Sequence, residues 1–476
     1  MADYELIFRD ADEARDVTLE TIEGEVPAGL RGRFLRNGPG LQRAGGDPLH
    51  FLDAHGFVAS ASFEPGRVRY DARHVETPLL RRERAAGRML QRRPFTNLPG
   101  GAWRNLLRLK FATGAGHDVY AWGGKVVPCD ATGHYLMDPI TLDTEGPAPL
   151  NRELHQLENL AAMPRLDPHT GHLVSYVVKP GVLGDDTVTF VEYDAAWGER
   201  ARVARPVGAK GALLHDIAVS KGHYVVAEFA RIALGPTALG TASAAGGARL
   251  PPEGPARLLV IPRAGEGPVR EIRLPAGHQT FHLFNAFEED GALVVDATMY
   301  EGLVDFKDLY PPALRASVGP SSPVKGPFIV RHRMDLATGE TTRSMIEGAR
   351  GESPSVRPDR LGARHRYGYV SAATSRGDEP SGEAYFWFHG VGKVDFEART
   401  MSVWDAGPRV VLSAPQFVAR GESEDDGWLL AWAHDAAKDR GEVVILDARD
   451  LPRGPVARLA LPRPLPSASH CAWMPA

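Results

Sequence analysis

The sequence predicts an all-β protein, and among all-β architectures it favours a β-propeller. Three observations lead to this fold class: many short runs rich in β-branched and aromatic residues, frequent turn residues between them, and a length of 476 residues. The chain contains 51 glycines and 38 prolines, which makes it rich in turn formers but not a low-complexity chain. This composition is typical of strands joined by tight turns rather than of long helices.

Strand-like runs follow one another from about residue 20 to the end of the chain. Most of them are bounded by Gly, Pro, Asp or Asn. The clearest are LVSYVV (173–178), TVTFVEYD (187–194), HYVVAEF (223–229), RLLVIP (257–262), ALVVDATMY (292–300) and EVVILDA (442–448). Related turns with a leading Asp, often followed by Pro or Gly, occur at 138–141, 167–171 and 335–339.

Chain length separates the two all-β architectures that such runs can build. A sandwich rarely needs more than about 400 residues, whereas radial blades of four strands can use the whole chain. Seven blades would average about 68 residues each, loops included. No change in composition marks a domain boundary, so we expect residues 1–476 to form a single domain.

Charge and cysteine content exclude several classes of protein. The formal net charge of -5 gives no basic excess, which argues against a nucleic-acid partner. Two cysteines, Cys129 and Cys471, are too few for a disulfide framework or a four-cysteine zinc site. The first residues lack the pattern of a signal peptide, and no run of about 18 apolar residues is present. We therefore expect a cytoplasmic protein, with peripheral membrane association left open.

Residues 78–114 depart from this pattern of strands and turns. They contain nine Arg or Lys residues and one Glu, interleaved with Met, Leu, Phe and Trp. One interpretation is a helical insertion that packs its apolar side on the body and leaves its arginines in solvent. The other is a surface that enters a membrane interface, where basic residues meet headgroups and Trp and Leu enter the acyl boundary. The sequence leaves both interpretations open.

Three of the 17 histidines stand out because each adjoins an apolar run. His215 lies in LLHDIAVS, His282 in FHLFNAFEED and His470 in PSASHCAW. His215 and His282 are 67 residues apart, close to one average blade, and His282 and His470 are 188 apart, close to three. Equivalent positions on inner strands converge on the axis of a propeller. Converging histidines without cysteine partners suit non-heme iron, and also zinc, copper or nickel.

Ordered motifs extend over nearly the whole chain. They are GEVPAGLRGRFLRNGPG (24–40), HFLDAHGFVASASF (50–63), GGKVVPCDATGHYLMDPITLDT (123–144), AMPRLDPHTGHLVSYV (162–177), LLHDIAVS (213–220), FHLFNAFEEDG (281–291), GESPSVRPDRLGARHRYGY (351–369), PQFVARGESEDDGWLLAW (415–432) and the final PSASHCAWMP. With these motifs the chain resembles the carotenoid cleavage oxygenase family. The resemblance implies a seven-bladed β-propeller with a dome of loops and helices over its top face. It also implies four axial histidines that hold Fe(II), glutamates that orient three of them, and dioxygen insertion across an alkene in an apolar tunnel.

Within this resemblance, three of the four metal ligands are present. His215, His282 and His470 match family ligands. Met163 stands at the position of the remaining ligand, in a stretch that reads Ala-Met-Pro-Arg-Leu-Asp-Pro where the family has a histidine. Glu352 matches the glutamate that orients His282.

The other two supporting carboxylates are altered. Asp130, one methylene shorter, stands where a glutamate would orient His215, and Ala414 stands where one would support His470. Loss of such a carboxylate typically costs about 10–100-fold in metal affinity or activity. A thioether such as that of Met163 is a poor ligand for Fe(II). We therefore expect Fe(II) to bind more weakly than in an ordinary member, or to be absent.

These departures leave three functions open. The first is a divergent oxygenase that uses Fe(II) and dioxygen to cleave a conjugated C=C bond of an apolar carotenoid, apocarotenoid, phenylpropenoid or stilbene-like substrate. The second is a non-cleaving enzyme, an isomerase or cyclase, in which Asp130, His134 and His55 serve as acid–base groups. The third is a propeller that binds an apolar ligand without catalysis.

Overall fold

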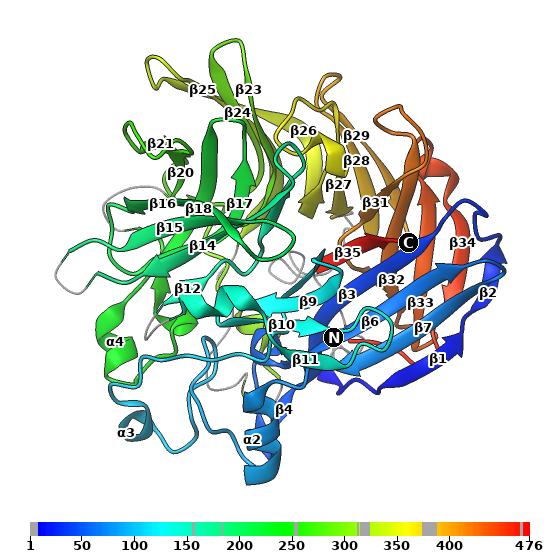
Figure 1. The fold of residues 1–476 in the computed structure, drawn as a ribbon, viewed down its shortest axis with the longest axis horizontal. Coiled ribbons are helices and arrows are strands. Elements are labelled where there is room, and N and C mark those ends of the chain that lie inside the picture. The colour runs from blue at the N-terminus through cyan, green and yellow to red at the C-terminus, as the bar shows by residue number, and fades with distance from the viewer. Residues whose placement is uncertain are drawn as a thin grey trace.

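Antiparallel sheets arranged around a common centre make up most of the molecule (Figure 1). The structure is a computed structural model and describes residues 8–154, 158–181, 184–251, 256–311, 314, 324–373, 388–466 and 470–476. The sheets form the seven blades of a propeller, numbered here in chain order. The prediction of an all-β, seven-bladed propeller is therefore confirmed. The single domain expected over residues 1–476 stays a prediction.

The first three blades follow one another along the chain. Blade 1 contains β1 (Ala14–Thr18), β3 (Gly32–Leu41), β6 (His55–Glu64), β7 (Arg67–His74) and β35 (His470–Pro475). Blade 2 contains β8 (Asp118–Trp122), β9 (Lys125–Asp130), β10 (Gly133–Met137) and β11 (Thr144–Pro147). Blade 3 contains β12 (Asn159–Leu160), β13 (Arg165–Asp167), β14 (His172–Lys179), β15 (Thr187–Tyr193) and β16 (Glu199–Pro206).

The next three blades include a shared strand. Blade 4 contains β17 (Ala212–Val219), β18 (His223–Ile232), β19 (Ala248–Arg249), β20 (Arg257–Pro262) and β21 (Arg270–Arg273). Blade 5 contains β22 (His278–Gln279), β23 (Leu283–Glu289), β24 (Ala292–Glu301), β25 (Lys325–Asp335) and the first part of β26 (Thr341–Ser355). Blade 6 contains the last part of β26 with β27 (Tyr367–Ala372), β28 (Gly390–Asp395) and β29 (Thr400–Asp405).

The two ends of the chain close the ring of blades. Blade 7 contains β30 (Val410–Leu412), β31 (Gln416–Ala419), β32 (Gly427–Asp435), β33 (Arg440–Asp447), β34 (Pro455–Ala460) and, from the N-terminal region, β2 (Glu20–Gly24). Conversely, the C-terminal strand β35 belongs to blade 1, where it pairs with β3 and places His470 opposite Asn37. Hydrogen bonds between distant parts of the chain therefore tie the first and last blades to both chain ends.

Short helices and one small ribbon lie outside the blades. The α-helices gather on one side of the sheets (Figure 1) and are α2 (Pro78–Ala86), α3 (Ala102–Asn105) and α4 (Leu234–Ala238). The 3-10 turns are η2 (Phe51–Asp53), η3 (Pro149–Glu153), η4 (Ala245–Gly247), η5 (Lys307–Leu309), η6 (Pro358–Arg360) and η7 (Leu451–Arg453). A ribbon pairs β4 (Arg43–Ala44) with β5 (Asp47–Pro48).

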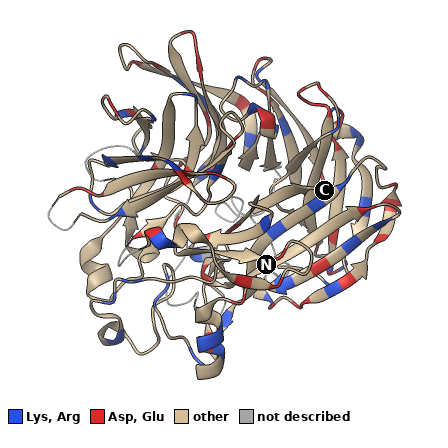
Figure 2. Ribbon diagram, in the orientation of Figure 1, with Lys and Arg blue, Asp and Glu red and all other residues tan. Residues whose placement is uncertain are grey.

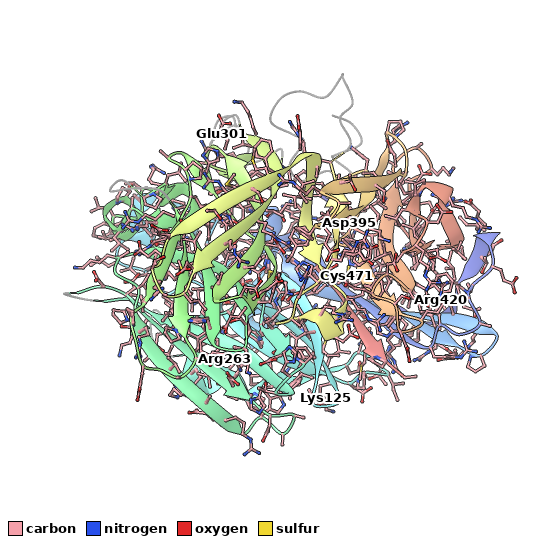
Figure 3. All side chains as sticks on the ribbon, turned by 90° about the horizontal axis from the view of Figure 1, so that it is seen from above. Lys125, Arg263, Glu301, Asp395, Arg420 and Cys471 are labelled. Carbon is pink, nitrogen blue, oxygen red and sulfur yellow. The ribbon has the colours of Figure 1, made fainter. Side chains whose placement is uncertain are left out.

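Apolar contacts between neighbouring blades form the core. Middle strands such as β24 and β33 are buried along most of their length because other blades cover both faces. Phe34 of blade 1 stacks on Trp432 of blade 7, with ring centroids 5.1 Å apart. Phe190 of blade 3 stacks on Tyr224 of blade 4, with ring centroids 4.3 Å apart. Cys471 lies toward the middle of the molecule in Figure 3, where it packs against the apolar core of blades 1 and 7.

Two arginines of the basic 78–114 segment are buried, which corrects both interpretations for these residues. Arg93 is fully buried and contacts the Glu83 carboxylate at 2.5 Å, the Asp53 carbonyl at 2.8 Å and His55 Nε2 at 3.1 Å. Arg92 donates to the Asn97 side chain and to the carbonyl oxygens of residues 105, 108, 237 and 242. Buried guanidinium groups require such partners, so these charges hold the insertion to the propeller.

Helix α2 is fixed at both ends by its sequence. The hydroxyl of Thr77 accepts a hydrogen bond from the amide of Leu80, and Pro78 occupies the first turn, where a missing N–H costs nothing. Gly87 ends the helix in a left-handed conformation with φ of 64°. In the described residues, no helix is long and apolar enough to cross a membrane.

We expect Glu83→Gln to destabilise the protein by about 3–5 kcal/mol, because it leaves the guanidinium of Arg93 buried without its counter-charge. Urea unfolding followed by fluorescence would measure the loss as a lower midpoint. Glu76→Gln is the matched control, since Glu76 pairs with the half-exposed Arg84 and should contribute about 0–1 kcal/mol. Equal shifts in the two variants would contradict this account.

Candidate metal centre and substrate cavity

Four histidine rings from four blades lie together at the centre of the propeller. They are His117, directly before β8, His215 in β17, His282, directly before β23, and His470, the first residue of β35. Successive ring centroids are 5.3 Å apart for His117 and His215, 4.9 Å for His215 and His282, 5.3 Å for His282 and His470, and 4.9 Å for His470 and His117. The four rings therefore form a closed cluster.

The spacing of these rings fits ligands of a single metal ion. Imidazoles bound to one ion at about 2.1 Å have ring centroids about 5 Å apart, and nitrogens at right angles about 3.0 Å apart. Nε2 of His215 and Nε2 of His282 are 3.1 Å apart. Among the described residues, no three His, Cys, Asp or Glu side chains already have the geometry of a bound ion, so binding would require the rings to reorient.

The chemistry of the donor set also fits a metal. Nε2 of His117 is buried and makes no hydrogen bond to any residue in the described part of the chain. Burial lowers the pKa of His117 to about 4, and burial together with the neighbouring histidines lowers the pKa values of His215 and His470 well below the ordinary value. Neutral imidazoles without a cysteine among them suit Fe(II), as well as zinc, copper or nickel.

Glu352 supports one member of the cluster. Its carboxylate lies 2.6 Å from Nδ1 of His282 and accepts a second hydrogen bond from the hydroxyl of Thr298 at 2.8 Å. Burial alone would lower the pKa of His282, but the carboxylate of Glu352, with a smaller contribution from Asp216, opposes burial, and the pKa is raised. A carboxylate at Nδ1 leaves Nε2 of the same ring for a metal.

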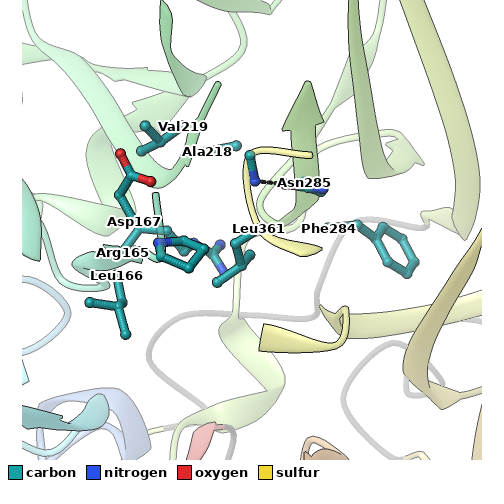
Figure 4. Close-up of a pocket in the computed structure, with 10 residues that line it drawn as sticks. Arg165, Leu166, Asp167, Ala218, Val219, Phe284, Asn285 and Leu361 are labelled. Atoms are coloured by element: carbon teal, nitrogen blue, oxygen red, sulfur yellow. Dashed lines mark hydrogen bonds between the residues drawn. The ribbon is translucent and has the colours of Figure 1, made fainter. Parts of the chain in front are cut away.

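A buried ion pair ties two of the histidines to each other. Asp216 follows His215 and accepts hydrogen bonds from the amides of Ile217 at 2.7 Å and Leu283 at 2.8 Å. Leu283 follows His282, so this carboxylate fixes the backbones of β17 and β23 side by side. Arg165 neutralises it through contacts of 2.8 and 2.9 Å. Arg165 also borders a small second pocket beside Ala218, Phe284 and Leu361 (Figure 4).

Three other residues that the resemblance places at the metal site, Ala414, Met163 and Asp130, differ in how they lie relative to the cavity. Ala414 lines the central cavity, consistent with its lack of a supporting carboxylate. Met163 is half-buried and is not part of the cavity wall, although the preceding Ala162 is. Asp130 lines the cavity, but its carboxylate accepts hydrogen bonds from the amides of Ala115 and Thr132. A role for Asp130 in orienting His215 stays a prediction.

Two histidines offered as acid–base groups lie away from the cavity. His134 is held between Tyr120 and the carbonyl of Ala161, and burial lowers its pKa to about 3. His55 contacts Glu83, and burial lowers its pKa to about 4. Neither side chain lines the cavity wall, so both serve the packing of their own surroundings.

His117 is the functional candidate that the sequence reasoning missed. It follows the Gly-Ala-Gly stretch 114–116 and directly precedes the strand DVYAW. A histidine beside a strand-like run was the signal that selected His215, His282 and His470, and the same signal was present here. No family motif covers this position, so the resemblance did not point to it.

The four histidines open onto a largely apolar cavity of about 320 Å³. All four rings belong to its wall, together with Glu352. Loops of the helical side cover it, from η2, the 92–113 region, the 232–248 region and η5. Its aromatic lining consists of Phe51, Phe95, Phe111, Tyr176, Phe229, Phe281, Tyr300, Phe306 and Phe388. Such a wall suits an apolar molecule.

The fold and this centre define a class of protein: a seven-bladed propeller with a ring of axial histidines under an apolar cavity. The family model described as retinal pigment epithelial membrane protein matches residues 8–475. The chain therefore belongs to this family, the carotenoid cleavage oxygenases, whose members are non-heme iron enzymes.

Individual relatives agree with this assignment. The apocarotenoid-15,15'-oxygenase of Synechocystis is 30% identical over 475 residues, covering 96% of this chain and 93% of the relative. An isoeugenol monooxygenase of Pseudomonas putida is also 30% identical, over 473 residues, with 95% and 93% covered. A solved structure of cobalt-substituted Synechocystis apocarotenoid oxygenase superposes with a TM-score of 0.87 at 28% identity, covering 100% of this chain and 99% of that one.

We expect Glu352→Gln to lower the pKa of His282, because burial then acts on the ring without the opposing carboxylate. NMR titration of the metal-free protein would show His282 losing its proton at lower pH. Affinity for Co(II) should fall about 10–100-fold in the same variant. Glu288→Gln is the control, because Glu288 pairs with the distant His223 and should leave both quantities unchanged. An unchanged His282 titration in Glu352→Gln would rule out this role.

Proposed function

We propose that this chain is a non-heme Fe(II) oxygenase that cleaves a conjugated C=C bond of an apolar substrate with dioxygen. The observation that carries the proposal is the ring of four imidazoles, one buried and three partly buried, in the wall of an aromatic cavity. The similarity to apocarotenoid and isoeugenol oxygenases supports the same reaction class. A bound Fe(II) would activate dioxygen, and one oxygen atom would enter each of two carbonyl products.

The protein itself would bind, orient and shield the alkene. Phe281 and Phe306 lie 5.5 Å apart, and Phe281 packs 5.7 Å from the ring of His215. Aromatic faces at this distance from the histidines can hold a planar conjugated system beside the metal position. Glu352 would keep His282 oriented, and the loops over the cavity would keep bulk water away.

The cavity also bears on the substrate class. In the described part of the chain, its wall contains no Lys or Arg, so nothing there matches a substrate carboxylate. Its volume is near the lower end of the range of about 300–1,000 Å³ typical of small-molecule sites. We therefore propose an uncharged substrate, either a phenylpropenoid or stilbene-like molecule or an apocarotenoid whose reacting part enters this space.

We expect the Fe(II)-loaded protein to convert at least one of three probes in air: isoeugenol, a neutral stilbene, or an apocarotenal. Mass spectrometry would detect paired carbonyl products that carry ¹⁸O from labelled dioxygen. His282→Ala should lower kcat/KM at least about 100-fold, since it removes a proposed ligand. His169→Ala, on an exposed turn, is the control and should retain activity.

The other two functions predict different results in this assay. Isomerised or cyclised product without ¹⁸O would favour the non-cleaving enzyme. Tight probe binding with no turnover after anaerobic Fe(II) loading would favour the binding protein. Either outcome would overturn the oxygenase proposal.

A peripheral membrane contact is the second part of the proposal. Trp103 and Leu107 are 84% and 73% exposed, and Leu239 is 59% exposed on the neighbouring α4 segment. The amide of Leu107 donates to the carbonyl of Ala238 at 2.7 Å, so these apolar side chains belong to one surface. Figure 2 shows basic residues on nearby α2, and Arg104, Arg108 and Lys110 are exposed beside the patch.

This surface leads toward the cavity. Phe111, shortly after Leu107, and Ile232, shortly before α4, both line the cavity wall. An apolar substrate dissolved in a membrane would therefore reach the histidines without crossing bulk water. Exposed Trp and Leu flanked by cations are typical of surfaces that enter the lipid interface.

We expect Trp103→Glu and Leu239→Glu each to weaken binding to vesicles of mixed neutral and anionic lipid by about tenfold, because each removes about 1.5 kcal/mol of apolar burial. Co-sedimentation would measure the bound fraction. Ile140→Glu is the matched control, since Ile140 is 54% exposed in a turn of blade 2. Absence of vesicle binding by the unmodified protein would remove the membrane proposal.

A further inference from the structure

His117 is the member of the histidine cluster to which the family resemblance gives no role. Its ring centroid lies 4.9 Å from that of His470 and 5.3 Å from that of His215. Its Nε2 atom is buried and has no hydrogen-bond partner among the described residues, although nearly all buried polar atoms in proteins have one. A bound metal ion would satisfy this nitrogen, and the neighbouring rings would complete the ion's coordination.

The segment that carries His117 is held in place from several directions. The backbone amide of His117 donates to the carbonyl of Cys129 at 3.1 Å. The side-chain amide of Asn37 donates to the carbonyls of both Ala115 and Asp118 at 2.7 Å. The carboxylate of Asp130 accepts the amide of Ala115 at 2.5 Å. Residues on both sides of His117 are therefore fixed before any ion binds.

Close backbone packing explains the two glycines before His117. A side chain at Gly114 would place its Cβ 2.3 Å from the Cα of His55, and one at Gly116 would place its Cβ 2.9 Å from the carbonyl oxygen of Ala54. Between them, Ala115 has a left-handed φ of 59°. The segment is thus pressed against the start of β6 in a conformation that costs strain and that the surrounding contacts must hold.

The residues next to positions 117 and 163 both contact the buried thiol of Cys129. Sγ of Cys129 is 3.5 Å from the carbonyl oxygen of Asp118 and 3.3 Å from that of Ala162. Asp118 follows His117, and Ala162 precedes Met163. A side chain at 117 can therefore enter the same region of the axis as a side chain at 163, but from the start of blade 2 rather than from the segment between β12 and β13 of blade 3.

We propose that His117 is the fourth imidazole ligand of the metal centre, in place of the histidine that the family resemblance places at position 163. The inference rests on the proposed metal function, and it changes one expectation from the sequence. Weaker Fe(II) binding is expected from the sequence because Met163 replaces a ligand. With His117 as the fourth imidazole, the number of ligands is unchanged, and this reason for weaker binding no longer applies. Asp130 acts in this arrangement as a positioning residue, which holds the segment of His117 rather than the ring of His215.

Counting the imidazoles around a bound ion tests the proposal directly. The full-length chain would be stripped of metal, loaded anaerobically with one equivalent of Co(II), and examined by X-ray absorption spectroscopy. We expect four imidazoles per ion in the unmodified protein and three in His117→Gln. Affinity for Co(II) should fall in His117→Gln by more than the about 10–100-fold that loss of an outer carboxylate costs.

Met163→Leu is the matched control and should leave both the imidazole count and the Co(II) affinity unchanged. Asp130→Ala should keep the ability to bind Co(II) with lower affinity and a less ordered fourth imidazole. Far-UV circular dichroism and urea unfolding of the metal-free variants would check their folds. If His117→Gln fails to fold, the imidazole count of the unmodified protein decides alone.

The outcomes separate this inference from the proposed function. Three imidazoles in the unmodified protein, or a count and affinity that His117→Gln does not change, would overturn the role of His117 and leave the oxygenase standing. Loss of a ligand in Met163→Leu would also overturn it. Failure of the unmodified protein to bind Co(II) or Fe(II) would instead overturn the metal function, and the present inference with it.

Discussion

Pairing between β3 and β35 is the contact on which both the ring of blades and its centre depend. It joins the two ends of the chain, and its register places Asn37 opposite His470. The side chain of Asn37 then reaches blade 2, where it holds the carbonyls of Ala115 and Asp118 on both sides of His117. Closing the propeller and bringing His117 beside His470 are therefore one structural event. Because the contact joins residues more than 400 positions apart, the entropy lost on closing so long a loop must be offset by the packing of the blades between them.

Much of the fold and three histidines could be read from local patterns. Runs rich in β-branched and aromatic residues, with turn residues between them, indicated the strands, because each strand of a blade carries its own local signal. His215 and His470 stood out because each touches an apolar run that was predicted to be a strand. Their convergence followed from the geometry of a propeller, in which inner strands share an axis. Glu352 came from the resemblance, and its carboxylate lies 2.6 Å from Nδ1 of His282.

The features that were not predicted, the place of His117 and the burial of Arg93, depend on contacts between segments that are distant in the sequence. His117 lies beside a strand-like run as the other three histidines do, but nothing near it in the sequence shows that Asn37 and Asp130 hold its segment at the axis. Likewise, a run of arginines read locally is a solvated or membrane-facing surface, yet Arg93 is buried against Glu83 and the Asp53 carbonyl. In both cases the decisive partner lies on another element. Local hydrophobicity and charge cannot identify such partners, because the cost of burying a charge is set by what it meets there.

The four histidines form two pairs, each tied by a different device. His215 and His282 are linked through the carboxylate of Asp216, which binds the backbones of both strands. The other pair, His117 and His470, is linked through Asn37 and the β3–β35 pairing. Each pair can keep its internal geometry while the packing between blades sets the distance from one pair to the other. A donor can therefore be exchanged within one pair without disturbing the second. In such an exchange, the imidazole ligand would move from the start of blade 3 to the neighbouring start of blade 2. A propeller could then lose a histidine at position 163 and still surround an ion with four imidazoles.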